Sequence, residues 1–244
     1  MKSTTTRAAL LLAIVGVVVA LVVVLTRTGS SSSSSAEGLA GLAASAGVSE
    51  VLGLRPGDRV TVVEGEPVVG AEVLRAADTV RAEVISEFTG DGAALGPGFW
   101  DRARAGVTPR AALRDRAVRA AVLDKVRRVW AREAGLLADV SEQGFQRELA
   151  AENLRRAQAA REGRPLPGVP SYDEHTYARV RAAELDSALS KIHAAGLDLS
   201  ERRLREQYER MAGKDAPPFE QARDNVRHAL VAQEYLKALR ARAG

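Results

Sequence analysis

The sequence predicts a mainly α-helical protein in which a transmembrane helix and a short β-hairpin precede a multi-helix domain. Three observations support this prediction. Residues 8–25 form an uncharged apolar run, residues 58–69 alternate around a Gly-Glu-Pro break, and apolar residues then recur at spacings of three and four. Alternation with a period of two is typical of strands, whereas spacings of three and four are typical of amphipathic helices.

The first 27 residues are predicted to be a short cytoplasmic segment and an anchor helix that contacts the membrane through residues 8–26. At about 1.5 Å per residue, the apolar run extends roughly 27 Å, enough to cross a hydrocarbon core. Lys2 and Arg7 precede the run, which favours a cytoplasmic N-terminus and directs the rest of the chain outward. We therefore expect a single-pass protein of the cell membrane with an extracytoplasmic C-terminal domain.

A cleavable signal peptide that ends near Ala36 is the alternative interpretation, and it predicts a secreted protein. Signal peptides commonly have apolar regions of only about 7–15 residues, so we favour the uncleaved anchor. Both interpretations place the C-terminal domain outside the cytoplasm.

Composition excludes several classes of function. The chain has 35 basic and 31 acidic residues, and without Lys2, Arg7 and Arg27 the basic count is 32. A nearly neutral exterior lacks the charge excess that nucleic-acid binding uses. The absence of cysteine excludes disulfides, thiolate metal sites, a cysteine nucleophile and a lipid-modified cysteine.

Residues 28–56 contain a serine run and many small residues, which are typical of a flexible linker. The remaining residues, 57–244, have the length of one domain. In this domain residues 58–69 are predicted to form the hairpin, and a first amphipathic helix is predicted from Ala71 to Phe88. A glycine-rich loop that contains Phe99 and Trp100 follows.

Capping signals predict five further helices. Thr108 with Pro109, Ser141, Ser171 with Glu174, and Ser200 mark four starts, and the last helix follows the prolines at 217–218. The side chains expected to form the apolar faces of these five helices include Ala117, Val118, Ala121, Val122, Val126, Val129, Trp130, Phe145, Leu149, Leu154, Tyr177, Val180, Leu185, Leu189, Ile192, Leu204, Tyr208, Met211, Phe219, Val226, Leu230 and Leu239.

No motif indicates a cofactor, a metal ion or a catalytic residue. His175 and His193 lie on one predicted helix, but they are roughly 27 Å apart along its axis and cannot share a metal ion. The chain lacks a G-x-S-x-G nucleophile turn, a Walker loop and a dinucleotide fingerprint. The sequence does not exclude a Ser, His and Asp triad, because the members of a triad are adjacent only in the folded protein.

Large aromatic side chains are the candidates for peptide binding, because aromatic residues dominate such contacts. The candidates are Phe99, Trp100, Trp130 and Phe145. For Phe99 and Trp100, anchoring of the core is the favoured alternative to an exposed binding patch.

The segment VTVVEGEPVVGAEV, followed by several helices, resembles the N-terminal chaperone region of the SurA and PrsA type foldases. In that family a strand ends in a V-N-G-x-x-I-like turn and leads directly into a helix. Residues that match this pattern are Val63, Gly65, Glu66, Pro67, Val68 and Glu72. Glu64 replaces the usual Asn, and Val69 replaces the usual Thr or Ser cap.

Two later segments, LDLSERRLREQYERM and FEQARDNVRHALVAQEYLKAL, resemble the helices that lead into and return from the isomerase domain of those foldases. Only residues 212–218 separate them, which leaves no room for a parvulin domain. The resemblance therefore implies a chaperone-like domain without isomerase activity, whose partners are unfolded or nascent exported polypeptides. Peptidyl-prolyl isomerisation and a cell-envelope scaffold with one dedicated partner are the alternatives.

Overall fold

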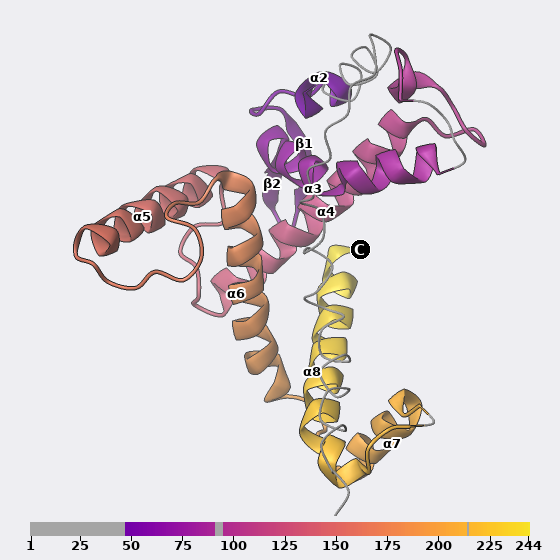
Figure 1. Ribbon diagram of the computed structural model, residues 1–244, viewed down its shortest axis with the longest axis vertical. Helices are drawn as coiled ribbons and strands as arrows, with labels where there is room; N and C mark the ends of the chain where they lie inside the picture. Colours follow the sequence, from indigo (N-terminus) through magenta and orange to yellow (C-terminus); the bar gives the residue numbers. More distant parts are fainter. Residues whose placement is uncertain (1–46, 91–94, 214) are drawn as a thin grey trace, which may run out of the picture. The chain divides into compact units, whose positions relative to one another are not determined.

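The computed structural model describes residues 47–90, 95–213 and 215–244, and helices dominate these ranges (Figure 1). The predicted anchor at residues 1–27 and the linker up to residue 46 lie outside them. Within the described ranges, no helix combines the length and apolar character needed to cross a membrane. The elements in chain order are α2 (Val48–Leu52), β1 (Arg59–Val63), β2 (Glu66–Val69), α3 (Gly70–Thr89), η2 (Phe99–Asp101), α4 (Pro109–Glu133), α5 (Glu142–Arg161), α6 (Glu174–Ala194), α7 (Glu201–Met211) and α8 (Phe219–Ala243).

The described residues belong to two compact units. The larger unit contains residues 47–198 and 231–244, and the smaller contains residues 199–230. In the smaller unit, α7 and the first part of α8 share one apolar cluster, and the rings of Tyr208 and Phe219 meet edge to face with centroids 5.7 Å apart. The other members of this cluster are Leu199, Leu204, Ala222, Val226 and Leu230.

The folded part of the chain includes residues that the sequence assigns to the linker. Val48, Val51 and Leu52 are buried on one side of α2, in the same cluster as side chains of α3 and α4. Their spacing of three and four places them on one helical face, and Gly53 ends the helix at a φ of 61°. The linker prediction for residues 28–56 therefore does not describe residues 48–54, which are part of the core.

The predicted hairpin is confirmed as an antiparallel pair of strands in which Val63 pairs with Glu66. Glu64 and Gly65 form its turn with φ values of 49° and 82°, as a two-residue hairpin turn with left-handed backbone requires. Strand β2 continues directly into α3. Val69 offers no capping oxygen, and the first amides of α3 instead donate to the carbonyls of Asp58 and Pro56 at 2.7 and 2.9 Å.

Most predicted caps are confirmed, and one is wrong. The hydroxyls of Thr108, Ser141 and Ser200 each accept a hydrogen bond from a backbone amide in the first turn of α4, α5 and α7. Helix α6 begins after Asp173 instead of Ser171, because the Asp173 carboxylate accepts from the amide of Thr176 at 2.6 Å.

Three side chains that were predicted to face the core are exposed instead. The exposed fraction of the residue is 69% for Leu154, 48% for Ile192 and 44% for Met211. Leu154 lies nine residues after Phe145, which is half a turn away from the buried face of α5. Ile192 and Met211 lie close to the C-terminal ends of α6 and α7.

Candidate functional site

Phe99 and Trp100 lie on η2 and are only 4% and 6% exposed. Their rings meet edge to face with centroids 5.1 Å apart, in the cluster that α2, α3 and α4 also form. This pair therefore anchors the core and does not form an exposed apolar patch.

Trp130 and Phe145 lie in two other clusters. Trp130 is partly buried against Tyr235 and His193, with ring centroids 5.4 and 5.7 Å away. Phe145 is buried, and the Arg75 guanidinium lies 3.9 Å from its ring centroid. The structure thus distributes the four predicted aromatic residues over three clusters, and peptide binding through them stays a prediction.

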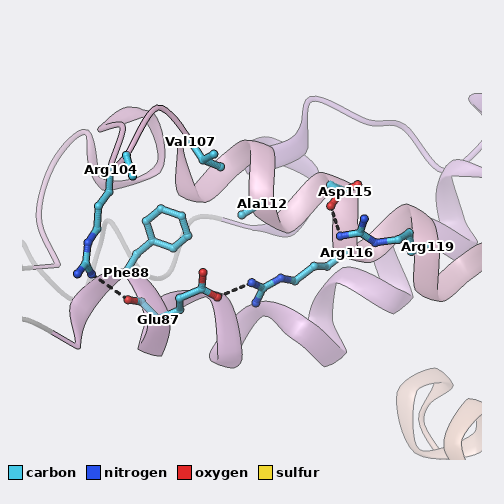
Figure 2. Close-up of a pocket in the computed structure, with 9 residues that line it drawn as sticks. Glu87, Phe88, Arg104, Val107, Ala112, Asp115, Arg116 and Arg119 are labelled. Atoms are coloured by element: carbon cyan, nitrogen blue, oxygen red, sulfur yellow. Dashed lines mark hydrogen bonds and ion pairs between the residues drawn. The ribbon is translucent and has the colours of Figure 1, made fainter.

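An open cavity of about 500 Å³ lies where the end of α3 meets the turn before α4 and the first turns of α4 (Figure 2). Its apolar lining comes from Phe88, Ala105, Val107 and Ala112. Phe88 is 7% exposed and belongs to the same cluster as Phe99 and Trp100, whereas Val107 is 46% exposed. Val107 therefore gives the cavity an accessible apolar surface, and Phe88 connects the cavity to the cluster of Phe99 and Trp100.

Three arginines and two acidic residues, Glu87 and Asp115, form the polar lining of this cavity. Arg116 pairs with Glu87 and with Glu83 at 3.2 Å, and these carboxylates raise the pKa of Arg116 above its ordinary value. Arg104 donates to the carbonyl oxygen of Glu87 at 3.2 Å, and Arg119 pairs with Asp115. These contacts hold cationic N–H donors in place around the apolar lining (Figure 2).

Sequence reasoning missed this cavity. Ala112, Asp115, Arg116 and Arg119 recur at spacings of three and four, so they share one face of α4. That pattern was visible in the sequence, but the approach of Val107 to Phe88 depends on the fold.

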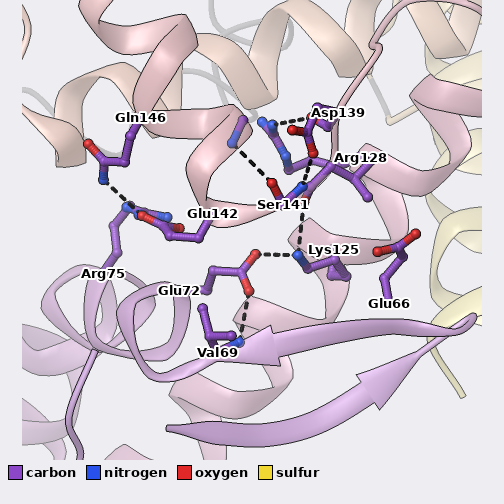
Figure 3. Close-up of polar contacts among 12 residues, drawn as sticks. Glu66, Val69, Glu72, Arg75, Lys125, Arg128, Asp139, Ser141, Glu142 and Gln146 are labelled. Carbon is purple, nitrogen blue, oxygen red and sulfur yellow. Dashed lines mark hydrogen bonds and ion pairs between the residues drawn. The ribbon is translucent and has the colours of Figure 1, made fainter. Parts of the chain in front are cut away.

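A buried ion pair supports the region where the hairpin, α3 and α4 meet (Figure 3). Lys125 is 1% exposed and Glu72 is 8% exposed, and the Lys125 ammonium lies 2.7 Å from a Glu72 carboxylate oxygen. Lys125 also donates to the carbonyl of Val140 at 2.9 Å, and Glu72 accepts from the amide of Val69 at 2.9 Å. Burial raises the pKa of Glu72 and outweighs the opposing effects of Lys125 and the Val69 amide.

A second ion pair in the same view joins α3 to α5. Arg75 binds Glu142 and lies 3.5 Å from Glu174 at the start of α6. Arg75 thereby joins α5 and α6 to α3, and Lys125 joins α4 to α3. Among the residues that the structure describes, no group of His, Cys, Asp and Glu side chains is arranged to hold a metal ion.

Comparison with known proteins gives no match: neither a family model, nor a curated protein, nor a solved structure resembles the chain significantly. The function must therefore be inferred from the residues and their geometry.

Proposed function

We propose that this protein is a membrane-anchored, chaperone-like protein that holds unfolded exported polypeptides outside the cytoplasm and has no isomerase activity. The observation that carries the proposal is the open cavity in Figure 2, where the exposed apolar side chain of Val107 lies among guanidinium groups that acidic residues of the lining hold in place. Its volume of about 500 Å³ suits one or a few side chains of a bound segment.

The two kinds of lining would act on different parts of an unfolded chain. An apolar client side chain would be buried against Phe88 and Val107, which removes it from water. Arginine N–H groups around the cavity would donate to the client's carbonyl oxygens, which every residue of a polypeptide carries. Such binding is tolerant of sequence and needs neither a cofactor nor a fuel molecule.

Two further features support the proposal. The cavity lies on α3 and α4, which the buried Lys125–Glu72 ion pair holds together, so little conformational entropy is lost when a client binds. The apolar run at residues 8–25 would hold the protein at the membrane, where exported chains emerge, and would raise its local concentration.

The test is suppression of client aggregation by the full-length protein in lipid nanodiscs, followed by light scattering of a chemically unfolded client. We expect Val107→Asp to raise the concentration needed for half suppression at least about fivefold, because a carboxylate in the lining would lose its hydration when an apolar side chain covers it. Val62→Asp is the matched control, since Val62 is 45% exposed and does not line the cavity.

The proposal is overturned if the wild-type protein does not delay aggregation, or if both variants perform equally well. Accelerated cis to trans exchange in a proline peptide would instead support the isomerase. Crosslinking in cells to one stoichiometric partner, in place of many exported clients, would support the scaffold.

A further inference from the structure

One face of α6 consists mainly of small and apolar side chains and carries two charged residues, Glu184 and Lys191. Beside it, Leu136 helps to line an open groove of about 830 Å³. The residues of α6 that line the groove are Val180, Ala183, Glu184, Ser187, Ala188, Lys191 and Ile192. They follow spacings of three and four over about three turns, which is the pattern of a face that packs against another helix.

The two charged residues of this face have a specific placement. Glu184 and Lys191 are seven residues apart, so they lie two turns apart on the same side of α6. The midpoint between them falls between Ser187 and Ala188, whose small side chains allow a second helix to approach closely. The face therefore carries one negative and one positive charge at equal distances from a centre of small residues.

We infer that a second copy of this chain covers the groove, with its α6 antiparallel to the first and a two-fold axis between Ser187 and Ala188. In this arrangement Glu184 of each copy faces Lys191 of the other, so one patch is complementary to itself. Val180 and Ile192 lie toward the two ends of the face, where they would be buried between the helices.

Charge complementarity favours a second copy over an apolar occupant. An apolar segment would cover Lys191 without giving it a partner, and burial of an unpaired charge is costly. Glu184 also lies 3.2 Å from Arg181 of its own helix, and this contact can persist while the carboxylate faces Lys191 of the other copy.

The interface is independent of the proposed client site, because no residue of α6 lines the cavity in Figure 2. A dimer would carry two such cavities, so it would bind two segments of one client with increased avidity. Loss of the dimer and loss of client binding can therefore be measured separately.

The test measures the oligomeric state of the full-length protein by sedimentation in density-matched detergent. We expect the wild type to be a dimer and both Glu184→Lys and Lys191→Glu to raise the dimer dissociation constant at least about tenfold, since like charges then face each other. The doubly exchanged chain, and an equimolar mixture of the two single variants, should dimerise again because opposite charges face each other once more. Lys237→Glu, on an exposed part of α8, is the control and should leave the dimer unchanged.

A monomeric wild type overturns the inference. A dimer that is equally stable in all four charge variants also overturns it, because the contact then lies elsewhere, for example in the predicted anchor. Failure of the doubly exchanged chain and of the mixture to dimerise, while their circular dichroism matches that of the wild type, overturns it as well.

Discussion

The guanidinium of Arg242 binds the carboxylate of Glu64 through two hydrogen bonds of 3.0 Å, although the residues are 178 positions apart. Arg242 also donates to Glu133 through two hydrogen bonds of 2.9 Å. The last turn of α8 is therefore attached both to the hairpin turn and to the end of α4. These contacts lower the pKa of Glu133 and raise that of Arg242.

We expect Arg242→Ala to lower the free energy of unfolding by about 1 kcal/mol, because it removes a two-carboxylate ion-pair network that is only partly exposed. Urea denaturation of the membrane-reconstituted protein measures this change. Arg240→Ala in the same turn is the control, since Arg240 is exposed, and an equal loss in both variants would contradict a specific role for Arg242.

The same contact gives a reason for glutamate at the first position of a two-residue hairpin turn, where Asn is common. Glu64 has a φ of 49°, a conformation that Asn adopts more easily than Glu. In the Arg242→Ala background we expect Glu64→Asn to stabilise the protein by about 0.5 kcal/mol, whereas in the wild type the lost ion pair offsets this gain. A double-mutant cycle measures the coupling, and additive effects would show that Glu64 does not depend on Arg242.

Local signals in the sequence predicted the local parts of the fold. Thr108 and Ser141 cap helices because capping depends on the first turn alone, and the hairpin follows from alternation around its turn. Helix α2, at residues 48–52, was not predicted for two reasons. A serine-rich and alanine-rich segment precedes it, and five residues are too few to show a helical repeat of apolar positions.

Contacts between residues that lie far apart in the sequence could not be predicted from local sequence patterns. Lys125 and Glu72 lie far apart in the sequence, and nothing in their local sequence distinguishes them from exposed residues such as Lys191 or Glu184, yet the fold buries them as a pair. The cavity likewise needs Val107 and Phe88 to be brought together by the packing of α3 on α4. A candidate list based on aromatic side chains therefore selected core residues such as Phe99.

Glu72 should make stability depend on pH. Its pKa in the folded protein lies above the ordinary value of 4.5, so the folded chain binds this proton more tightly than the unfolded chain. The stability contributed by Glu72 is therefore fully present below pH 4.5 and is lost as the pH rises through the folded-state pKa.

Glu72→Gln removes this titration while keeping an oxygen for the Val69 amide. We expect the unfolding free energy of the variant, relative to the wild type, to increase as the pH rises from 4 to 8 in a denaturation series. A relative decrease over that range would show that attraction to Lys125 outweighs burial.

Arg156 should control the order of the loop between α5 and α6. It is 1% exposed and donates to the carbonyls of Pro167 and Val169 and, at 3.1 Å, to the hydroxyl of Tyr172. Lysine lacks the planar fork that reaches these acceptors together, so Arg156→Lys should release the loop.

The readout is hydrogen exchange at the amide of Tyr172, which donates to the side-chain oxygen of Asn153 at 2.8 Å. We expect Arg156→Lys to accelerate this exchange at least about tenfold, since local opening becomes easier when a charged hydrogen-bond network is lost. Arg155→Lys is the neighbouring control, because Arg155 is exposed and pairs only with Glu152 among the described contacts, and comparable acceleration there would contradict the assignment.

Gly70 should be required where β2 turns into α3. A Cβ atom at this position would lie 1.9 Å from the carbonyl oxygen of Arg55, and that backbone is held by hydrogen bonds from Asp58 to Arg55 and from Gly70 to Asp58. Because backbone cannot move aside as a flexible side chain does, we expect Gly70→Ala to cost about 1–3 kcal/mol, measured by denaturant unfolding. Gly57→Ala is the matched control, since its Cβ would meet no atom within 4 Å. Equal stability of the two variants would show that the backbone of residues 55–58 can shift without loss of stability. The close contact between Gly70 and the Arg55 carbonyl would then not determine where α3 begins.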